Sequence, residues 1–361
     1  MSKKNQRRGL FIKNQPKARL IQKWVFSCVA ALGIIYGYIF LWPVVPLAPN
    51  TANQQVYKVK IQPQSGLASI AGQLKEQGVR IGSIELQIGA RLLFVGSKLK
   101  PGTYLLPLDA SLGKLLLQVA RGDRVRESLA IIPGMTIWQV RAIVDAHPAL
   151  IHQTKGMSSK DLLQSLGLAY PGDEGIFLPD TYIFDPDEPD INIYRKASQA
   201  MQKQLAKTWS QKAASSPLRS PYELLILASI VEKETGRLSD RGLVAAVFTN
   251  RLNIGMPLQT DPTVIYGIGP KFDGNLRKTD LRRDSPYNTY MRKGLPPTPI
   301  AMPSKESIQA AANPATSNAL YFVAKGDGSS HFSKNLNEHE AAVNLYQRKY
   351  SPKASLSNAT N

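Results

Sequence analysis

Two acidic side chains stand at the end of an apolar segment that shows every sign of being a buried helix. The segment LASIVEKETG, residues 227–236, carries Glu232 and Glu234 directly after a run of apolar residues, 224–231. Just before that run, the sequence SPYE at 220–223 predicts a helix start, with serine as N-cap, proline at the first helical position and glutamate at the third. A helix that is apolar on nearly all sides is typically buried, so its charged end could work in a dry site.

The two glutamates are expected to serve different purposes. At about 100° per residue they point roughly 200° apart, so they cannot share one pocket as the paired carboxylates of glycosidases do. Glu234 continues the row of Ile230 and Val231, and burial together with the negative helix end should raise its pKa towards that of a general acid. Glu232 could instead pair with a base such as Arg237. The alternative is that both are ordinary surface residues.

Two polar, aromatic stretches further along the chain are candidates for binding a sugar. Tyrosine rings stack on pyranose faces, and amides and hydroxyls form hydrogen bonds with sugar substituents. Taken alone, either stretch is more typical of a loop rich in proline and asparagine; sugar binding is favoured by their combination with Glu234 and by the family resemblance given below. Thr235 could hold Glu234 or only cap the helix, and Asn250 and Arg251 could reach the cleft or satisfy backbone groups. The candidate residues in 258–267 and 285–294 are Gln259, Thr260, Asp261, Tyr266, Tyr287, Asn288, Thr289 and Tyr290.

The residue types that bind metals are scarce in this sequence. Cys28, the only cysteine, lies in an apolar run, which excludes a disulfide framework, a cysteine zinc site and a thiol nucleophile in the soluble part. The histidines form no HExxH motif and no close pair in sequence. We therefore predict no metal site and no cofactor. The four histidines are His147, His152, His331 and His339.

The N-terminal region predicts a membrane anchor. Residues 24–42 are nineteen positions without a charge, enough to cross a bilayer core as a helix, and we place the transmembrane helix at 24–43. Residues 1–23 carry eight Lys or Arg and no acid, which predicts a cytoplasmic N-terminus and an extracytoplasmic remainder. A cleaved signal peptide is the rival interpretation. The length of the apolar run and the lack of an A-x-A site favour the anchor.

The chain is strongly basic, with a net charge of +19 over 361 residues. Without the eight basic residues of the tail, 37 Lys and Arg still face 26 acids, a net charge of +11. The predicted topology keeps this charge away from nucleic acid, so anionic lipid headgroups or an acidic wall polymer are the expected counterparts. A plain solvated basic surface is the alternative.

The sequence predicts an α+β fold with several segments. The segments YKVKIQPQSGLASIAGQL and ESLAIIPGMTIWQVRAIV align at an offset of 70 residues, each reading as a strand followed by an amphipathic helix. Such units resemble LysM-like wall-glycan modules, with a plain α+β packing domain as the alternative. We predict a cytoplasmic tail at 1–23, the membrane helix at 24–43, a linker at 44–55, a LysM-like α+β domain at 56–150, a mixed helical and strand catalytic domain at 151–350 and a disordered tail at 351–361.

Five motifs together resemble the MltG (YceG-like) family of endolytic murein transglycosylases, in the family's order and over residues 45–350. The resemblance implies a single-pass inner-membrane protein with a LysM-like region and a catalytic domain, and it places the catalytic glutamate on Glu234. It implies peptidoglycan glycan strands as substrate and peptidoglycan synthases as further partners, with no nucleic acid. The motifs are EGIFLPDTY, LASIVEKETG, FTNRLNIGMPLQTDPTVIYGIG, SPYNTYMRKGLPPTPIAMP and LYFVAKGDGSSHFSKNLNEH.

The activity implied is cleavage of the β-1,4 bond from N-acetylmuramic acid to N-acetylglucosamine, forming 1,6-anhydro ends and terminating glycan elongation. One carboxyl group suffices when the muramic 6-hydroxyl replaces water, although Glu174, Asp180 and Asp261 stay open as second acids. Glu174 and Asp180 could line the cleft or could be turn residues. The competing hypotheses are a hydrolytic muramidase and a non-catalytic membrane-anchored scaffold that binds peptidoglycan.

Overall fold

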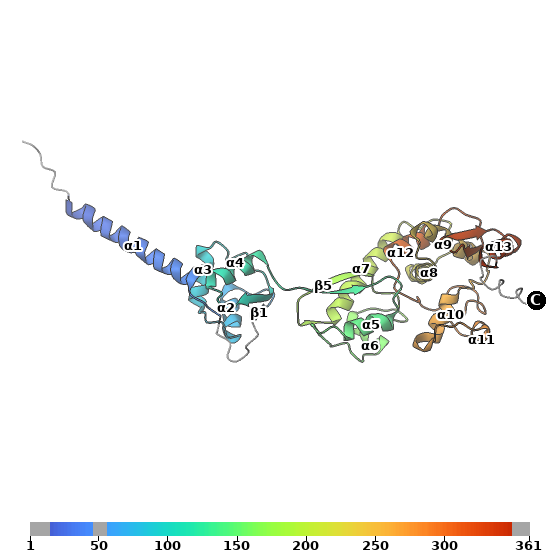
Figure 1. Cartoon of the computed structure of the whole chain (residues 1–361), viewed down its shortest axis with the longest axis horizontal. Coiled ribbons are helices and arrows are strands. Elements are labelled where there is room, and N and C mark those ends of the chain that lie inside the picture. The colour runs from blue at the N-terminus through green and yellow to red at the C-terminus, as the bar shows by residue number, and fades with distance from the viewer. Residues whose placement is uncertain (1–14, 46–55, 349–361) are drawn as a thin grey trace, which may run out of the picture. The chain divides into compact units, whose positions relative to one another are not determined.

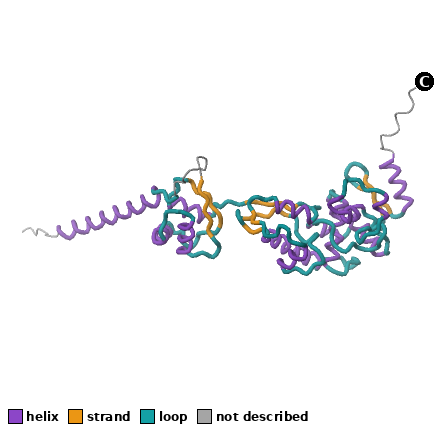
Figure 2. The backbone as a smooth tube through the Cα atoms, turned by 90° about the horizontal axis from the view of Figure 1, so that it is seen from below, coloured by secondary structure: helices purple, strands orange, loops and turns teal. Residues whose placement is uncertain are grey.

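The computed structural model describes residues 15–45 and 56–348, which form a mixed α+β protein with one long N-terminal helix (Figure 1). It divides into two compact units, residues 1–126 (unit 1) and 127–361 (unit 2). The strands of the described residues form four separate two-stranded sheets, so helices and loops provide most of the framework (Figure 2). Residues 1–14, most of the expected linker and the expected disordered tail lie outside the described residues.

Unit 1 combines the apolar N-terminal helix with a small α+β module. β1 and β2 pair antiparallel, with Val59 opposite Tyr104, and the helices cover this hairpin. Its elements are α1 (Gln15–Leu41), β1 (Val56–Ile61), α2 (Leu67–Glu76), α3 (Ser83–Leu92), β2 (Gly102–Pro107) and α4 (Leu112–Arg121).

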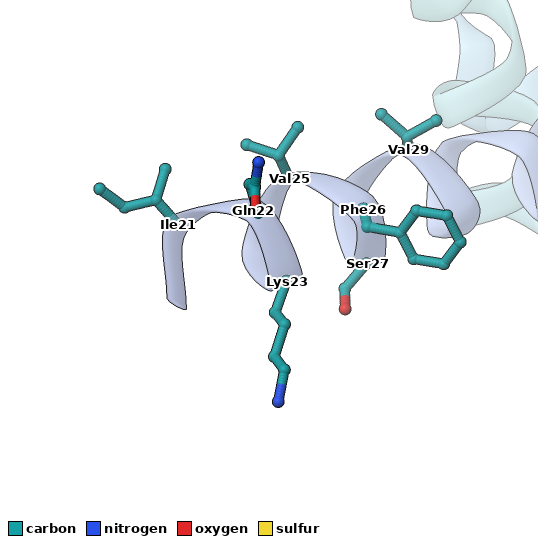
Figure 3. A pocket seen from close by; sticks show the side chains of 7 residues that line it. All are labelled: Ile21, Gln22, Lys23, Val25, Phe26, Ser27 and Val29. Atoms are coloured by element: carbon teal, nitrogen blue, oxygen red, sulfur yellow. The ribbon is translucent and has the colours of Figure 1, made fainter. Parts of the chain in front are cut away.

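α1 is, within the described residues, the one helix long and apolar enough to cross a membrane, over Leu20–Leu41. Its 22 residues would span about 33 Å at the usual helical rise, slightly more than a bilayer core. Figure 3 shows a shallow hollow on its surface, with Ile21, Val25 and Val29 on one side of the helix and Lys23 pointing to the other. This hollow lies on an exposed apolar helix, which is the surface expected to meet lipid.

The first two residues of the predicted linker, Val44 and Val45, belong to the core of unit 1, and residues 46–55 lie outside the described residues. The Val44 amide donates to the Ala110 carbonyl at 2.9 Å, and the Arg80 amide donates to the Val44 carbonyl at 2.8 Å. The sequence PVVPLAPN resembles a linker by composition, but its two valines complete the apolar core instead.

Unit 2 holds the helices and hairpins around the candidate site. β3 pairs antiparallel with β5, β7 with β8, and β4 runs parallel to β6. Its elements are β3 (Glu127–Ile131), α5 (Ile137–Asp145), β4 (Leu150–Ile151), α6 (Ser159–Leu166), β5 (Asp180–Phe184), β6 (Glu188–Pro189), α7 (Ile191–Trp209), α8 (Pro221–Glu234), α9 (Leu238–Asn253), α10 (Asp261–Ile268), α11 (Lys278–Arg282), α12 (Lys305–Ala312), β7 (Tyr321–Ala324), β8 (Ser330–Ser333) and α13 (Leu336–Val343).

The predicted strand and helix repeat is present, but its two copies belong to different units. β1 ends at Ile61 and α2 begins at Leu67, while β3 ends at Ile131 and α5 begins at Ile137, an offset of 70 in both cases. The structure places the boundary after Arg126, not after residue 150 as expected. The reason is strand pairing: β3 pairs with β5, which lies inside the expected catalytic domain.

α8 is the central helix of unit 2. Every residue from Leu224 to Val231 is buried, and α8 packs against α7, α9, α10 and α12. The one polar residue of that stretch, Ser229, donates its hydroxyl to the Ile226 carbonyl and accepts from the Ile300 amide at 3.0 Å. A helix enclosed on all sides has little freedom to shift, so the residues at its end are fixed in place.

Candidate active site

The start of α8 follows the predicted chemistry. The Ser220 hydroxyl accepts from the Glu223 amide at 3.1 Å, and Pro221 is the first helical residue. α8 ends at Glu234 because Thr235 adopts an extended backbone (φ −146°, ψ 127°). Gly236, a residue type common just after a helix, follows Thr235. Glu234 is therefore the last helical residue, at the end of the buried stretch.

The Glu234 carboxyl is sheltered and bound to one hydroxyl. The Thr260 hydroxyl donates to Glu234 Oε1. Burial raises the pKa of Glu234, the negative charge of Asp261 raises it further, and the Thr260 hydrogen bond and the positive charge of Arg251 oppose the rise. The net effect is a raised pKa, which is the property predicted for a general acid.

Glu234 opens onto a pocket of about 370 Å³ in unit 2. The walls come from α8, α9, the loop before α10 and its first residue, Tyr290 in the loop after α11, strand β7 and α13. The pocket combines acidic, basic, amide and aromatic groups, the mixture that binds sugars. Its lining residues are Glu234, Phe248, Arg251, Leu258, Gln259, Asp261, Tyr290, Tyr321, Phe322, Leu336 and His339.

A cluster of buried threonines holds Thr260 against Glu234. The Thr260 amide donates to the Thr289 hydroxyl at 3.1 Å, and the Thr289 and Thr263 hydroxyls lie 2.9 Å apart. The Thr263 hydroxyl also donates to the Thr260 carbonyl at 2.8 Å. Thr289 is buried and positions Thr260, and it is not among the residues that line the pocket.

Gln259 and Asp261, on either side of Thr260, both line the pocket. Gln259 has φ +48°, a left-handed conformation that is uncommon for glutamine. Its backbone amide donates a hydrogen bond to the Thr289 carbonyl at 3.1 Å. Such backbone strain persists only where surrounding contacts enforce it and is frequent at functional sites. Asp261 accepts a hydrogen bond from the Tyr290 hydroxyl at 2.6 Å, which joins the two predicted stretches across the pocket.

Arg251 is a pocket residue that also satisfies backbone groups, so both alternatives left open by the sequence hold for it. Its Nε donates to the Leu320 carbonyl at 2.7 Å and its Nη1 to the Leu258 carbonyl at 2.6 Å. Its guanidinium lies over the Tyr321 ring at 5.3 Å from the centroid. The neighbouring Asn250 donates only to backbone carbonyls, of Ser317 and Ala319.

Glu232 points away from the pocket, as the helical geometry predicted. Its carboxylate lies 3.2 Å from Arg241, and both side chains are largely buried. It also accepts hydrogen bonds from the amide and hydroxyl of Ser304, the N-cap of α12. The expected partner was Arg237, but one further turn of α9 brings Arg241 into place. Through Ser304 and Arg241, Glu232 joins α8 to α12 and α9.

Thr235 and Asn288 make structural contacts instead of lining the pocket. The Thr235 hydroxyl accepts from the Arg237 amide at 3.1 Å, which closes the turn after α8. Asn288 is buried, and its Nδ2 lies within hydrogen-bonding distance of three carbonyl oxygens, those of Asp280, Leu281 and Arg283. The sequence identified both residues by type, but their partners come from the local turns.

Tyr266 and Tyr287 form a second aromatic group apart from the Glu234 pocket. Tyr266 stacks on Trp138 with ring centroids 5.1 Å apart, and Tyr287 meets Tyr266 edge to face at 5.0 Å. The Tyr266 hydroxyl forms a hydrogen bond with the carboxyl group of Glu174. The hydroxyl groups of Tyr287 and Thr298 form a hydrogen bond, with their oxygen atoms 2.8 Å apart.

Glu174 is a second buried carboxyl and Asp180 is an exposed one. The Glu174 carboxyl accepts from the amides of Ile137 at 2.9 Å and Gly175 at 3.2 Å, and burial raises its pKa to about 8. Asp180 is exposed at the start of β5, with Lys305 at 3.8 Å. Neither residue lines the Glu234 pocket.

One group of potential metal ligands lies elsewhere in unit 2, although the histidines form no close pair in sequence. Ligand atoms of Asp145, His152 and Asp190 lie within 4.8 Å of one another. The parallel pairing of β4 with β6 brings His152 and Asp190 together. The Asp190 oxygens already accept from the Thr154 amide and hydroxyl, so this carboxylate has a structural task of its own.

Comparison with known proteins assigns this fold and site to a family. The model of the YceG-like family matches residues 59–345. The chain belongs to the YceG-like family. It is similar to the endolytic murein transglycosylase of Bacillus subtilis, with 40% identity over 173 residues, or 48% of each chain. It is also similar to that of Streptococcus pneumoniae strain D39, with 30% identity over 91% of this chain and 65% of the relative.

The chain therefore spans less than two thirds of the length of these curated relatives. Among solved structures, a crystal structure of a yceG-like protein from Listeria monocytogenes matches 80% of this chain and 98% of its own, with a TM-score of 0.51 and 27% identity. The resemblance that the five motifs predicted is confirmed.

The wall of the pocket formed by the last part of the chain was not identified from the sequence. Tyr321 and Phe322 from β7, together with Leu336 and His339 from α13, line the pocket. The motif that contains them supported the family resemblance, but no residue in it was assigned a role. Tyr321 stacks with His339 at 5.2 Å, a pairing of residues eighteen positions apart that only the hairpin fold creates.

Proposed function

We propose that this protein is an endolytic peptidoglycan lytic transglycosylase that cleaves the β-1,4 bond between N-acetylmuramic acid and N-acetylglucosamine. The observation that carries the proposal is Glu234, a carboxyl with a raised pKa that follows the buried stretch Leu224–Val231 of α8 and opens onto a polar and aromatic pocket. The similarity to proteins named endolytic murein transglycosylases supports the substrate and the reaction type.

In the proposed reaction Glu234 acts first as an acid and then as a base. The protonated carboxyl donates its proton to the glycosidic oxygen, which leaves with the N-acetylglucosamine end as the bond to muramic C1 breaks. The muramic 6-hydroxyl then bonds to C1, closes the 1,6-anhydro ring and gives its proton to the Glu234 carboxylate. One carboxyl completes the cycle, because the incoming hydroxyl belongs to the substrate itself.

The Thr260 hydroxyl and Arg251 suit this double role. Both stabilise the carboxylate that exists between the two proton transfers, while burial and Asp261 favour the protonated form that begins the reaction. These opposing influences suit a carboxyl group that must both give and take a proton.

Gln259, Asp261 and Tyr290 are the predicted binding residues best placed to hold sugars. They line the pocket, and the hydrogen bond from Tyr290 to Asp261 orients both side chains. Arg251, Tyr321 and His339 extend this set on the opposite wall. The remaining predicted binding residues, Thr235, Glu232, Tyr266, Tyr287, Asn288 and Thr289, would then act through neighbouring groups.

We further propose that α1 anchors the protein in the inner membrane with the N-terminus in the cytoplasm. The supporting observations are the single apolar helix over Leu20–Leu41 and the basic residues before it. Unit 1, which contains the first copy of the strand and helix pattern, is proposed to be the LysM-like glycan-binding module. Anchoring would keep the enzyme at nascent glycan strands beside peptidoglycan synthases, where cleavage ends elongation.

The test compares purified full-length protein with Glu234→Gln on uncrosslinked glycan strands. We expect the unaltered protein to release fragments with 1,6-anhydromuramic ends and Glu234→Gln to release none, while its circular dichroism and melting temperature stay unchanged. Mass spectrometry identifies the ends, because reducing ends formed by hydrolysis carry one additional water. Reducing ends would identify a muramidase, and binding without cleavage would identify a scaffold; full activity of Glu234→Gln would overturn the role of Glu234.

A further inference from the structure

α3 of unit 1 carries an exposed apolar stripe that nothing in the described part of the unit covers. Ile84, Ile88 and Leu92, spaced by four residues, are 74%, 44% and 46% exposed, and Phe94 just beyond them is 84% exposed. The opposite face of α3, which includes Leu86, is buried in the core. A helix apolar on two faces needs a second apolar environment, because exposed apolar surface of this kind is unfavourable in water.

This stripe begins at the end of the membrane helix. The Tyr38 hydroxyl lies 3.4 Å from a carboxylate oxygen of Glu85, in the first turn of α3. Tyr38 is only three residues before Leu41, where the apolar span of α1 ends. The first turn of α3 therefore lies beside the last turns of that span, and Figure 1 shows α3 next to the end of α1.

The joint between α1 and the rest of unit 1 is packed and fixes this placement. Ile39 is 3% exposed, and α1 contacts α4 directly. A Cβ added at Gly113 of α4 would lie 2.8 Å from the Phe40 ring, so the two helices touch there. If α1 spans the bilayer, unit 1 cannot move away from the membrane surface.

Basic residues flank the stripe in sequence. Residues 56–126 contain eleven Lys and Arg against four Asp and Glu, a net charge of +7. Arg80, Arg91 and Lys98 are exposed close to the stripe in sequence, Arg91 within α3 itself. Apolar side chains flanked by basic ones are typical of helices that lie in the interface of membranes containing anionic lipid.

We propose that α3 is an interfacial helix, whose stripe of Ile84, Ile88, Leu92 and Phe94 inserts among the headgroups of the bilayer that α1 spans. The inference rests on the anchor proposed above and goes beyond it, because an anchor alone needs no second contact with lipid. Its consequence is that unit 1 is held at two points and takes one fixed orientation to the membrane.

The test measures immersion depth in the full-length protein reconstituted in vesicles of phosphatidylcholine and phosphatidylglycerol. Cys28 is the only cysteine, so Cys28→Ser gives a background in which Ile88→Cys and Phe94→Cys each carry one nitroxide spin label. Power saturation in electron paramagnetic resonance compares collision with oxygen, which concentrates in lipid, and with a water-soluble nickel chelate. Asp123→Cys is the control expected to lie in water. The first residues of α4 touch α1, and the ten residues of α4 place position 123, just beyond the helix, about 15 Å along the axis of α4 from this contact.

We expect labels at positions 88 and 94 to collide more with oxygen and the label at 123 more with the nickel chelate. In vesicles of phosphatidylcholine alone, the depth at 88 and 94 should decrease. If the labels at positions 88 and 94 are as accessible to the nickel chelate as the label at position 123, the proposal is overturned. Labels at 88 and 94 that are shielded from both oxygen and the chelate would indicate a protein partner on this face, which would also overturn it.

The native Cys28 separates this inference from the anchor itself. Labelled in the unaltered chain, it lies within α1 with its side chain exposed. A deep label at Cys28 with labels 88 and 94 in water would refute the interfacial helix and leave the anchor standing. A label in water at Cys28 would refute both.

Discussion

Replacing Thr260 with valine would remove the hydroxyl that donates to Glu234 and leave a branched side chain of nearly the same shape. Thr260 is buried, and its hydroxyl does not cap α10. The backbone bonds that place it, from its amide to Thr289 and from Thr263 to its carbonyl, do not involve the lost oxygen. Thr260→Val therefore changes the environment of the Glu234 carboxyl with little change in packing.

The hydrogen bond from Thr260 stabilises the charged form of Glu234, so its loss must raise the pKa of that carboxyl. A hydrogen bond to a charged group contributes about 1.5–3 kcal/mol, and about 1.4 kcal/mol corresponds to one pH unit. In the variant, water that enters the open pocket can replace part of the lost hydrogen bond to Glu234, so we use the lower end of this energy range. The first proton transfer needs the protonated form of Glu234, so activity falls as pH rises through this pKa. This fall is the alkaline limb of the curve of activity against pH, and Thr260→Val should move it upward by about one pH unit.

The assay is the release of anhydro ends at saturating and at limiting glycan, followed across the pH range. Thr263→Val is the matched control, because Thr263 belongs to the same hydroxyl cluster but does not touch Glu234. It should leave the alkaline limb in place. A limb that does not move in Thr260→Val, or that moves downward, would refute the role assigned to this hydroxyl.

Three further substitutions test other parts of unit 2. Asp261→Asn removes a negative charge that raises the pKa of Glu234, so the alkaline limb should move downward, opposite to Thr260→Val; an upward shift would contradict the sign. Glu232→Ala leaves Arg241 buried without its partner and should lower the free energy of unfolding by about 3–5 kcal/mol in denaturant titrations, whereas no loss would make the ion pair dispensable. Glu174 has a pKa of about 8 in the folded protein against an ordinary 4.5. Its contribution to the free energy of unfolding is therefore fully present below pH 4.5 and is lost as pH rises through 8, by up to about 5 kcal/mol. Glu174→Gln should flatten the dependence of the unfolding free energy on pH, and an unchanged slope would refute this account.

The sequence predicted the parts of the site that depend on local chemistry. The cap at Ser220, the buried run and the position of Glu234 follow from residue types and helical spacing, and the structure confirms them. The opposite directions of Glu232 and Glu234 follow from the same geometry. The offset of 70 between the two strand and helix units is equally a local pattern, and the structure reproduces it.

The parts that failed depend on contacts between distant segments. Residues 44 and 45 look like the start of a linker until the core of unit 1 is known to need two valines. The expected boundary at residue 150 differs from the division after Arg126, because β3 pairs with a strand about fifty residues later. Of the three threonines in one buried cluster only Thr260 faces Glu234, a distinction that no periodicity carries.

The pocket draws on widely separated parts of the chain, from Glu234 to His339. A ribosome synthesises Glu234 more than a hundred residues before His339, so α8 can fold while one wall of the site does not yet exist. The site therefore stays incomplete until the chain has been synthesised through α13. A chain truncated before α13 would keep Glu234 but would lack the wall that carries Leu336 and His339.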